Sequence, residues 1–159
     1  MASINVVGSL PHDVVAKVGG ELLRIAAGAF DDDIVAVRHS GRRIPVYKNH
    51  TRQIGLVDGL FECGGRLCFT ACVVGQFEPG ILHDQHSFGL VQGISLGWRS
   101  TLVEIESAGT RRITAGRLNE ISIVAGRKNE PVSRVRFGPL QHQRAMTNSE
   151  RASLKHQLR

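Results

Sequence analysis

The chain has 159 residues, of which 42% are hydrophobic and 21% are charged, and its formal net charge at pH 7 is +6. These values are ordinary for one globular domain, and no apolar stretch is long enough to cross a membrane. The N-terminal segment lacks the basic region and the apolar run of a secretory signal. We therefore expect an intracellular protein, and the 18 glycines indicate the many turns of a β-rich domain.

The charge is unevenly distributed. Residues 1–126 carry 12 basic and 12 acidic side chains, whereas residues 127–159 carry 8 and 2, so the whole excess lies in the C-terminal part. A basic tail can bind nucleic acid or an acidic protein, and it can equally be a solvated helix face with a frayed end. Both interpretations stay open, and we predict a folded domain over residues 1–140 followed by a basic tail over residues 141–159.

The N-terminal half alternates between strand patterns and turn signals. Three consecutive aspartates, Asp31, Asp32 and Asp33, favour a helix N-terminus, because the helix dipole stabilises anions there, and Gly41 is a suitable stop. In chain order the pattern predicts strands over residues 4–10 and 21–27, a helix over 30–39, an extended segment over 44–50, and a hairpin of strands 53–61 and 66–74 joined through Gly64 and Gly65.

The C-terminal half begins with a predicted helix over residues 78–91, whose apolar stripe would be Ile81, Leu82, Phe88 and Val91. Strands are then expected over residues 93–99, 101–106, 111–115, 118–124 and 132–137, followed by a terminal helix over 147–158. Because turns rather than crossover helices separate the strands, the pattern predicts a β-rich α+β fold. Its core would be an antiparallel or mixed β-barrel surrounded by a few helices.

Cysteine and histidine spacing gives little support for a metal site. Cys68 and Cys72 share one face of an apolar strand, which favours buried structural thiols, and no CxxC pair exists among the three cysteines. His83 and His86 would share a helix face and could ligate a metal, but a solvated face is the interpretation that we favour. We expect no metal and no cofactor.

The segment GISLGWRS, residues 93–100, contains the candidate nucleophile. In a strand, Ile94, Leu96 and Trp98 would face the core, and Ser95 would lie on the other face between two glycines. A backbone substrate could then approach Ser95 closely, as a nucleophile requires. The alternative is a plain strand with a serine on its polar face, and this segment alone favours the alternative.

A catalytic serine needs a general base and a group that orients the base. His50 ends the apolar segment IPVYKNH and precedes a polar turn, which is a suitable place for a residue in a cleft. Glu120 in LNEISIV shares a strand face with Ser122, and a carboxylate among so many apolar residues usually has a partner. A glutamate at the rim of a strand is the equally open alternative.

Taken together, these segments resemble the prohead (procapsid) maturation proteases of tailed bacteriophages. The resemblance covers roughly residues 27–124 and lies in the order of the elements AGAF, IPVYKNH, QIG, GGRL, a helix, GISLGWR and LNEISIV. A more distant similarity is to assemblin, the herpesvirus capsid protease, and it includes INVVGSL and ISIVAGRK. The resemblance implies a serine endopeptidase with His50 as base, Ser95 as nucleophile and Glu120 as the orienting acid.

The assemblin similarity also implies that Gly126 and Arg127 help to build an oxyanion hole. Two positions depart from the pattern: Thr51 follows His50 where phage relatives often have Asp, and assemblin uses a second histidine where this chain has Glu120. The second departure places the chain nearer to the phage proteases and makes the role of Glu120 the least secure of the three.

The resemblance further implies cleavage of a scaffold protein, of a scaffold-like segment of the major capsid protein, and of the protease itself, inside the procapsid of an infected host. Residues 147–158 could form a homodimer interface, and the basic tail could be a self-cleaved segment. The rival assignments are an inactive protease-like component of the procapsid, a nucleic-acid-binding module, and an α/β-hydrolase. The last is suggested by GISLG, which matches G-x-S-x-G, but that motif requires a turn into a helix.

Overall fold

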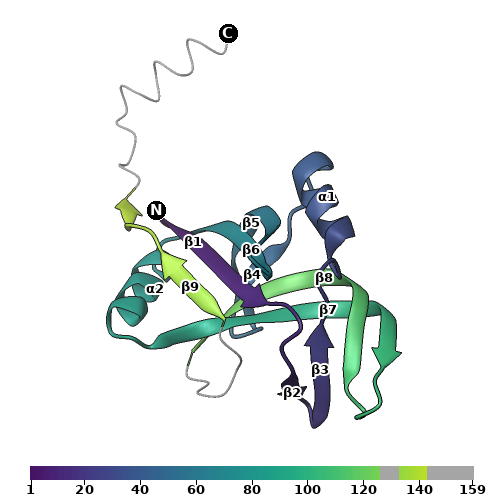
Figure 1. Ribbon diagram of the computed structural model, residues 1–159. Coiled ribbons are helices and arrows are strands. Elements are labelled where there is room, and N and C mark those ends of the chain that lie inside the picture. The colour runs from purple at the N-terminus through teal and green to yellow at the C-terminus, as the bar shows by residue number, and fades with distance from the viewer. Residues whose placement is uncertain (126–132, 143–159) are drawn as a thin grey trace.

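A computed structural model of the protein describes residues 1–125 and 133–142 (Figure 1). The elements in chain order are β1 (Ala2–Pro11), β2 (Ala16–Val18), β3 (Glu21–Ile25), α1 (Asp31–His39), β4 (Pro45–Lys48), β5 (Arg52–Cys63), β6 (Arg66–Gly75), α2 (Glu78–Ser87), β7 (Val91–Ile105), β8 (Arg111–Ala125), β9 (Arg134–Phe137) and β10 (Gln141–His142). The predicted terminal helix over residues 147–158 lies outside the described residues.

The strands form one mixed sheet in the order β10-β1-β6-β5-β4-β8-β3-β2, with β7 paired to β8 and β9 paired to β1. Strand β8 is the branch point of this sheet. β7 runs antiparallel along one edge of β8, while β3 and β4 run parallel to successive parts of its other edge. The predicted mixed, β-rich fold is therefore confirmed.

The predicted closed barrel is wrong, because the sheet does not close. Across residues 1–125 and 133–142, no strand pairs with the outer edge of β7. Where a further strand would begin, the side-chain hydroxyl of Ser133 accepts a hydrogen bond from the Ile94 amide at 3.0 Å. A side chain thus takes the place of a ladder partner, and the rest of this edge stays open.

Long strands replace the four short ones expected over residues 93–124. β7 and β8 are each 15 residues long and form a single antiparallel hairpin. The pairing register shifts at several points, including between Gly97 and Trp98 and between Ser100 and Leu102. Such bulges interrupt the alternation of apolar and polar residues without ending the strand, and this is why the sequence pattern predicted separate strands.

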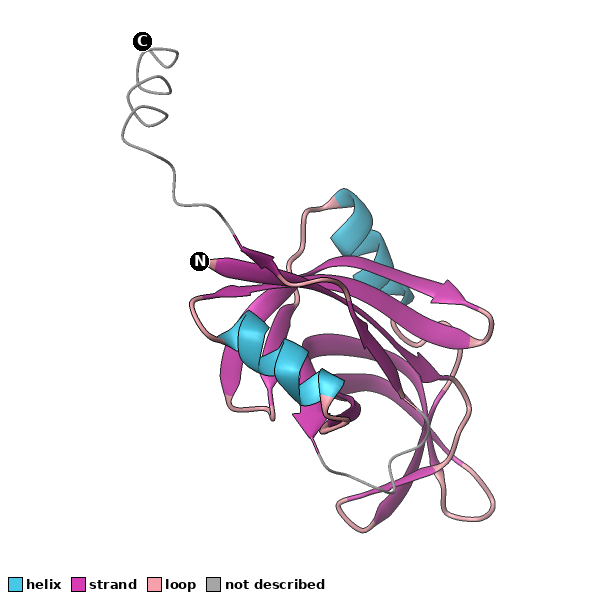
Figure 2. Cartoon of the chain, turned by 90° about the vertical axis from the view of Figure 1, so that its left-hand side faces the viewer, coloured by secondary structure: helices cyan, strands magenta, loops and turns pink. Residues whose placement is uncertain are grey.

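Helix α2 is shorter than predicted and does not bury the predicted apolar stripe. It ends at Ser87, Gly89 follows in the left-handed region at φ +69°, and the chain then enters β7 at Val91. Leu82 is 1% exposed, but Ile81 and Phe88 are 42% and 80% exposed. Figure 2, viewed from the side of α2, shows the two helices on different parts of the sheet. Neither helix in the described ranges is long and apolar enough to span a membrane.

Helix α1 occupies the predicted position, but its aspartates have different roles. Asp31 and Asp32 are exposed in the first turn, whereas Asp33 is buried and its carboxylate accepts the Leu118 amide at 2.7 Å. Arg42 pairs with Asp33 and donates to the Leu118 carbonyl. Burial, and secondarily the charge of Arg117, lowers the pKa of Arg42 from its ordinary value. This cluster ties α1 to the middle of β8.

The cysteines are free, and Cys68 and Cys72 are half-buried rather than buried as predicted. Both lie on the face of β6 that points away from the main hydrophobic core, since the alternate residues Leu67, Phe69, Ala71 and Val73 form that core. The strand was therefore predicted correctly, but the wrong face was assigned to the core.

Candidate active site

His50 lies in the tight turn between β4 and β5, over residues 49–51. Asn49 and His50 both have left-handed backbone conformations, with φ of 49° and 59°, and the Thr51 amide closes the turn on the Lys48 carbonyl at 3.1 Å. Such a conformation costs about 1–3 kcal/mol for a residue other than glycine, and it persists where surrounding contacts hold it. The turn is therefore a place where the fold constrains the backbone around His50.

Strand β8 supplies the contacts that hold this turn. The Asn49 amide donates to the Ile123 carbonyl at 3.0 Å, and the His50 amide donates to the Ser122 hydroxyl at 3.0 Å. In return, the Ala125 amide donates to the Asn49 side-chain oxygen at 3.3 Å. Because β4 pairs in parallel with this part of β8, the turn at the end of β4 reaches the end of β8.

Glu120 of β8 binds the imidazole of His50 directly, Oε1 to Nδ1. The Glu120 side chain is 16% exposed and that of His50 is 44% exposed. A carboxylate at Nδ1 fixes the tautomer that carries its proton on Nδ1, which leaves Nε2 free to accept a proton. The predicted pairing of His50 with Glu120 is thus a feature of the structure.

Gly97 makes room for this pair. It lies opposite Glu120 in the β7–β8 ladder, and a Cβ at this position would come within 2.5 Å of Glu120 Cγ. Real Cβ atoms do not approach other atoms this closely, so any larger residue would move Glu120. The absence of a side chain at Gly97 therefore leaves room for the Glu120 carboxylate and does not open a path to Ser95.

Ser95 lies directly opposite Ser122 in the same ladder, and its side chain is half-buried. The expectation that flanking glycines leave open space beside Ser95 is wrong. The Ser133 hydroxyl fills the space over Gly93, where a Cβ would lie 2.3 Å from it, and Glu120 fills the space over Gly97.

The structure brings His50 and Glu120 into contact and places Ser95 on the adjacent strand. In the part of the chain that the structure describes, Ser95 Oγ makes no hydrogen bond, to His50 or to any other residue. Catalytic hydrogen bonds are often long in unliganded enzymes and tighten when substrate binds. Ser122 connects the three candidate residues. It lies opposite Ser95 in the ladder, accepts a hydrogen bond from the His50 amide, and follows Glu120 by two residues on β8.

The sequence did not reveal the role of Ser122, which is fully buried at 0% exposure. Strand alternation correctly placed Ser122 on the face of Glu120. Its contact with His50 spans 72 residues and depends on the parallel pairing of β4 with β8, for which no local pattern exists. Gly126 and Arg127, the predicted oxyanion-hole residues, lie outside the described residues.

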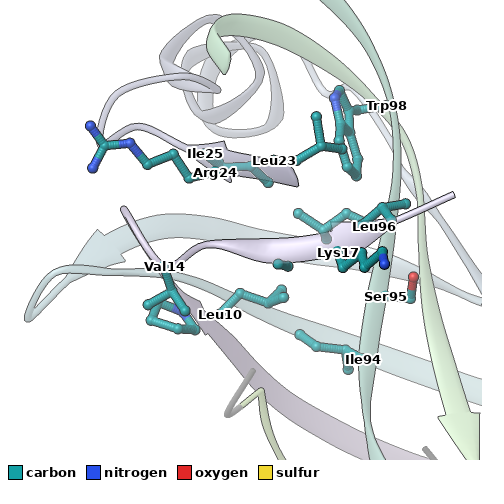
Figure 3. A pocket seen from close by; sticks show the side chains of 13 residues that line it. Leu10, Val14, Lys17, Leu23, Arg24, Ile25, Ile94, Ser95, Leu96 and Trp98 are labelled. Atoms are coloured by element: carbon teal, nitrogen blue, oxygen red, sulfur yellow. The ribbon is translucent and has the colours of Figure 1, made fainter. Parts of the chain in front are cut away.

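A cavity of about 130 Å³ opens beside Ser95, between β7 and the hairpin formed by β2 and β3 (Figure 3). Its walls are largely aliphatic, and Ser95, Lys17 and Arg24 are the polar residues of the lining. Sequence analysis did not predict the cavity, since no strand was predicted over residues 16–18 and these residues are distant in sequence from Ser95.

The remaining candidates do not form sites of this kind. His83 contacts Asp84 at 3.3 Å and His86 packs on the ring of Phe137 at 5.0 Å. No group of three or more potential metal ligands occurs within residues 1–125 and 133–142. β7 continues past Gly97 to Ile105 instead of turning into a helix, so the nucleophile elbow of an α/β-hydrolase is excluded.

The sequence matches no protein-family model and no curated protein. Among solved structures, the chain is similar to the protease of Kaposi's sarcoma-associated herpesvirus. The comparison with its hexapeptide phosphonate inhibitor complex gives a TM-score of 0.49 at 14% identity, covering 98% of this chain and 76% of that chain. Its complex with a dimer disruptor gives a TM-score of 0.49 at 16% identity, covering 96% of this chain and 88% of that chain. Its complex with the allosteric inhibitor compound 733 gives a TM-score of 0.47 at 17% identity, covering 97% of this chain and 89% of that chain.

Proposed function

We propose that the chain is a serine endopeptidase in which Ser95 is the nucleophile, His50 the general base and Glu120 the residue that orients the base. The observation that carries the proposal is the contact between Glu120 Oε1 and His50 Nδ1, held on β8 next to the ladder pair of Ser95 and Ser122. A half-buried carboxylate on one imidazole nitrogen, with a serine on the adjacent strand, is the arrangement that acyl transfer uses.

In the proposed mechanism, Ser95 Oγ attacks the scissile carbonyl carbon while His50 Nε2 takes the hydroxyl proton. Glu120 stabilises the imidazolium that forms. The proton then passes to the leaving amine, the peptide C–N bond breaks, and an acyl-enzyme remains on Ser95. Water, deprotonated by His50, hydrolyses this ester. Gly126 and Arg127 stay the proposed oxyanion donors, a role typically worth about 3–4 kcal/mol for one donor.

The outer edge of β7 supports an extended polypeptide as the substrate. The Ile94 amide points away from β8, since it binds the Ser133 hydroxyl, and alternation places the amide and carbonyl of Leu96 on the same outward edge. Within the described residues no strand uses that edge. An extended peptide that pairs with Leu96 would pass next to Ser95, which is the strand-addition mode of peptide recognition.

A fluorophosphonate probe tests the chemistry without knowledge of the substrate, because it reacts only with an activated serine. We expect labelling of the wild type at Ser95, identified by peptide mass spectrometry, and no labelling of Ser95→Ala or His50→Ala. Glu120→Gln keeps the shape but not the charge, and it should slow labelling by about a hundredfold or more.

Ser100→Ala, an exposed position on the same strand, is the matched control and should label like the wild type. Labelling at a serine other than Ser95, or equal labelling of His50→Ala, would overturn the assignment.

The order of sequence elements shared with prohead proteases supports a narrower proposal, that the substrates are a scaffold protein, the scaffold-like segment of a major capsid protein, and the chain itself. The site of action would be the interior of the procapsid, with a homodimer formed through residues 147–158 and a basic tail over residues 141–159. Co-expression of the wild type or Ser95→Ala with the neighbouring scaffold and capsid genes tests this, since only the wild type should shorten them.

A second candidate function is an inactive, protease-like component of the procapsid. The observation in its favour is that Ser95 Oγ has no hydrogen bond to His50 in the described part of the chain. The two functions give opposite results with the fluorophosphonate probe, because an inactive component leaves the probe unreacted under conditions in which the folded protein is intact.

A further inference from the structure

The cavity beside Ser95 is built from three separate parts of the chain. The end of β1 and the following turn contribute Leu10, Pro11 and Val14, the β2–β3 hairpin contributes aliphatic residues that include Ala16 and Leu23, and β7 contributes Ile94, Leu96 and Trp98. In Figure 3, Trp98 and Leu23 lie on one side of the cavity and Leu10 and Val14 on the other. Ten of its thirteen lining residues are apolar, so the cavity suits a hydrocarbon group.

The size of the cavity limits the group that can fill it. Its volume is about 130 Å³. An apolar protein cavity of about 150 Å³ accepts one benzene molecule, so this one accepts a side chain of the size of leucine, isoleucine or methionine. An indole is too large, and an alanine side chain would leave most of the space empty.

The position of the cavity relates it to the proposed chemistry. Ile94 and Leu96 line it with their side chains, whereas the Ser95 hydroxyl points to the opposite face of β7 (Figure 3). The backbone amide and carbonyl of Leu96 point to the free edge of β7. A peptide that pairs with this edge has its scissile carbonyl at Ser95, and successive side chains of a strand point to opposite sides. A side chain within two residues of the scissile bond is therefore the one that reaches the cavity.

The charged residues of the lining are not equivalent. Arg24 pairs with Glu106 and lies 4.0 Å from Asp13, so its charge is compensated. Lys17 is exposed and has no ion-pair partner among residues 1–125 and 133–142. Lys17 lines the cavity from β2. An uncompensated cation at the mouth of an apolar cavity complements an acidic group on the peptide that enters it.

We infer that this cavity is a specificity pocket for one medium-sized aliphatic side chain of the substrate, and that Lys17 selects an aspartate or glutamate two residues away, whose side chain points to the same face. The inference rests on the proposed peptidase function and names the substrate class for the same site. Leu, Ile or Met fills the cavity, and the carboxylate two residues away lies at the mouth with Lys17.

Cleavage of a diverse peptide library, analysed by mass spectrometry, tests the pocket. We expect Leu, Ile or Met to be enriched at one position within two residues of the cleaved bond, with Asp or Glu two residues from it. In matched synthetic peptides, replacing that residue by Ala should lower kcat/KM by about tenfold or more, since each methylene bound in a pocket contributes a factor of about 10 or more. A preference for Gly, Ala or a basic residue at that position overturns the inference.

Two variants test the residues that form the pocket. Ala16→Leu fills the cavity and should shift the preference to Ala or Ser. Lys17→Glu should lower cleavage of the acidic peptide by about threefold and raise cleavage of the same peptide with Lys in place of the acid, an effect that weakens in high salt. Arg38→Glu, the same charge change at an exposed site on α1, is the control and should leave both peptides unaffected. An unchanged preference in both pocket variants overturns the inference.

Fluorophosphonate labelling of Ser95 in every variant separates the two levels of the proposal. If Ser95 labels and the library shows no aliphatic or acidic preference, the pocket inference alone is wrong. If Ser95 neither labels nor supports cleavage in the folded wild type, the proposed function fails, and the pocket inference falls with it.

Discussion

The backbone amide of His50 donates to the hydroxyl of Ser122, which lies directly opposite Ser95 on the neighbouring strand. The proposed base and the proposed nucleophile are therefore both positioned next to one buried serine, although neither of their side chains binds it. The relative positions of His50, Ser95 and Glu120 therefore depend on the register in which β8 pairs with β4 and β7.

Removal of the Ser122 hydroxyl tests this positioning role. Ser122→Ala leaves the His50 amide without its acceptor in a turn that is already left-handed, at a cost of about 1–2 kcal/mol in the free energy of unfolding. We expect kcat to fall by about tenfold with KM little changed, because substrate contacts are not touched. Urea unfolding and turnover of a library-derived peptide measure the two effects. A KM effect without a kcat effect would show that Ser122 acts on substrate binding instead.

Gly97 should not tolerate even one added methyl group. Gly97→Ala places a Cβ against Glu120 Cγ and displaces the carboxylate from His50. We expect fluorophosphonate labelling to fall as far as in Glu120→Gln while the protein stays folded by circular dichroism. Gly80→Ala is the matched control, since its Cβ would meet no atom within 4 Å. This helix position should gain about 0.5–1 kcal/mol of stability and keep full labelling.

Asp33 should contribute more to stability than either of its neighbours. Asp33→Ala leaves Arg42 half-buried without its counter-ion and the Leu118 amide without its acceptor. We expect a loss of about 3 kcal/mol in the free energy of unfolding, measured in urea. Asp32→Ala, exposed in the same helical turn, should change stability by less than about 0.5 kcal/mol. Equal effects of the two substitutions would contradict the role of the Asp33–Arg42 cluster.

The pH dependence of thiol alkylation tests the burial of Cys68. Burial, more than any other cause, raises the pKa of its thiol above the ordinary value, so at neutral pH a smaller fraction is the reactive thiolate. Iodoacetamide should modify the exposed Cys63 first. The rate at Cys68 should keep rising to a higher pH than the rate of a free cysteine. Peptide mass spectrometry across a pH series measures both, and faster modification of Cys68 at pH 7 would contradict the assignment.

The sequence predicted the elements whose signals are local. The three aspartates in the first turn of α1 located that helix, and Gly64 and Gly65, with φ of 58° and 71°, formed the expected turn between β5 and β6. Which residues face the core was harder to predict, because α2 buries Leu82 but leaves Ile81 exposed. Local pattern predicts that a helix forms and says little about which side the sheet will cover.

For the candidate site, the residue types were predictable and their connections were not. His50 and Glu120 are 70 residues apart, and only the parallel pairing of β4 with β8 brings them together. Whether the outer edge of β7 is paired depends on segments that are distant in sequence. The alternation of residues within β7 therefore did not predict that the sheet stays open. The cavity, formed by β7 with the first 25 residues, was missed for the same reason.

The parallel pairing of β4 with β8 also has a consequence for biosynthesis. The residues that hold His50 in place are translated 70 or more positions after it, and Ser95 is likewise made before the strand that positions it. Contacts between such distant residues form late, after much of the chain has lost its freedom. On the proposed function, a nascent chain on the ribosome contains Ser95 and His50 before the strand that positions them has been made, and proteolytic competence would begin only once β8 has emerged and paired. The topology by itself would then keep the polypeptide latent while it is being made.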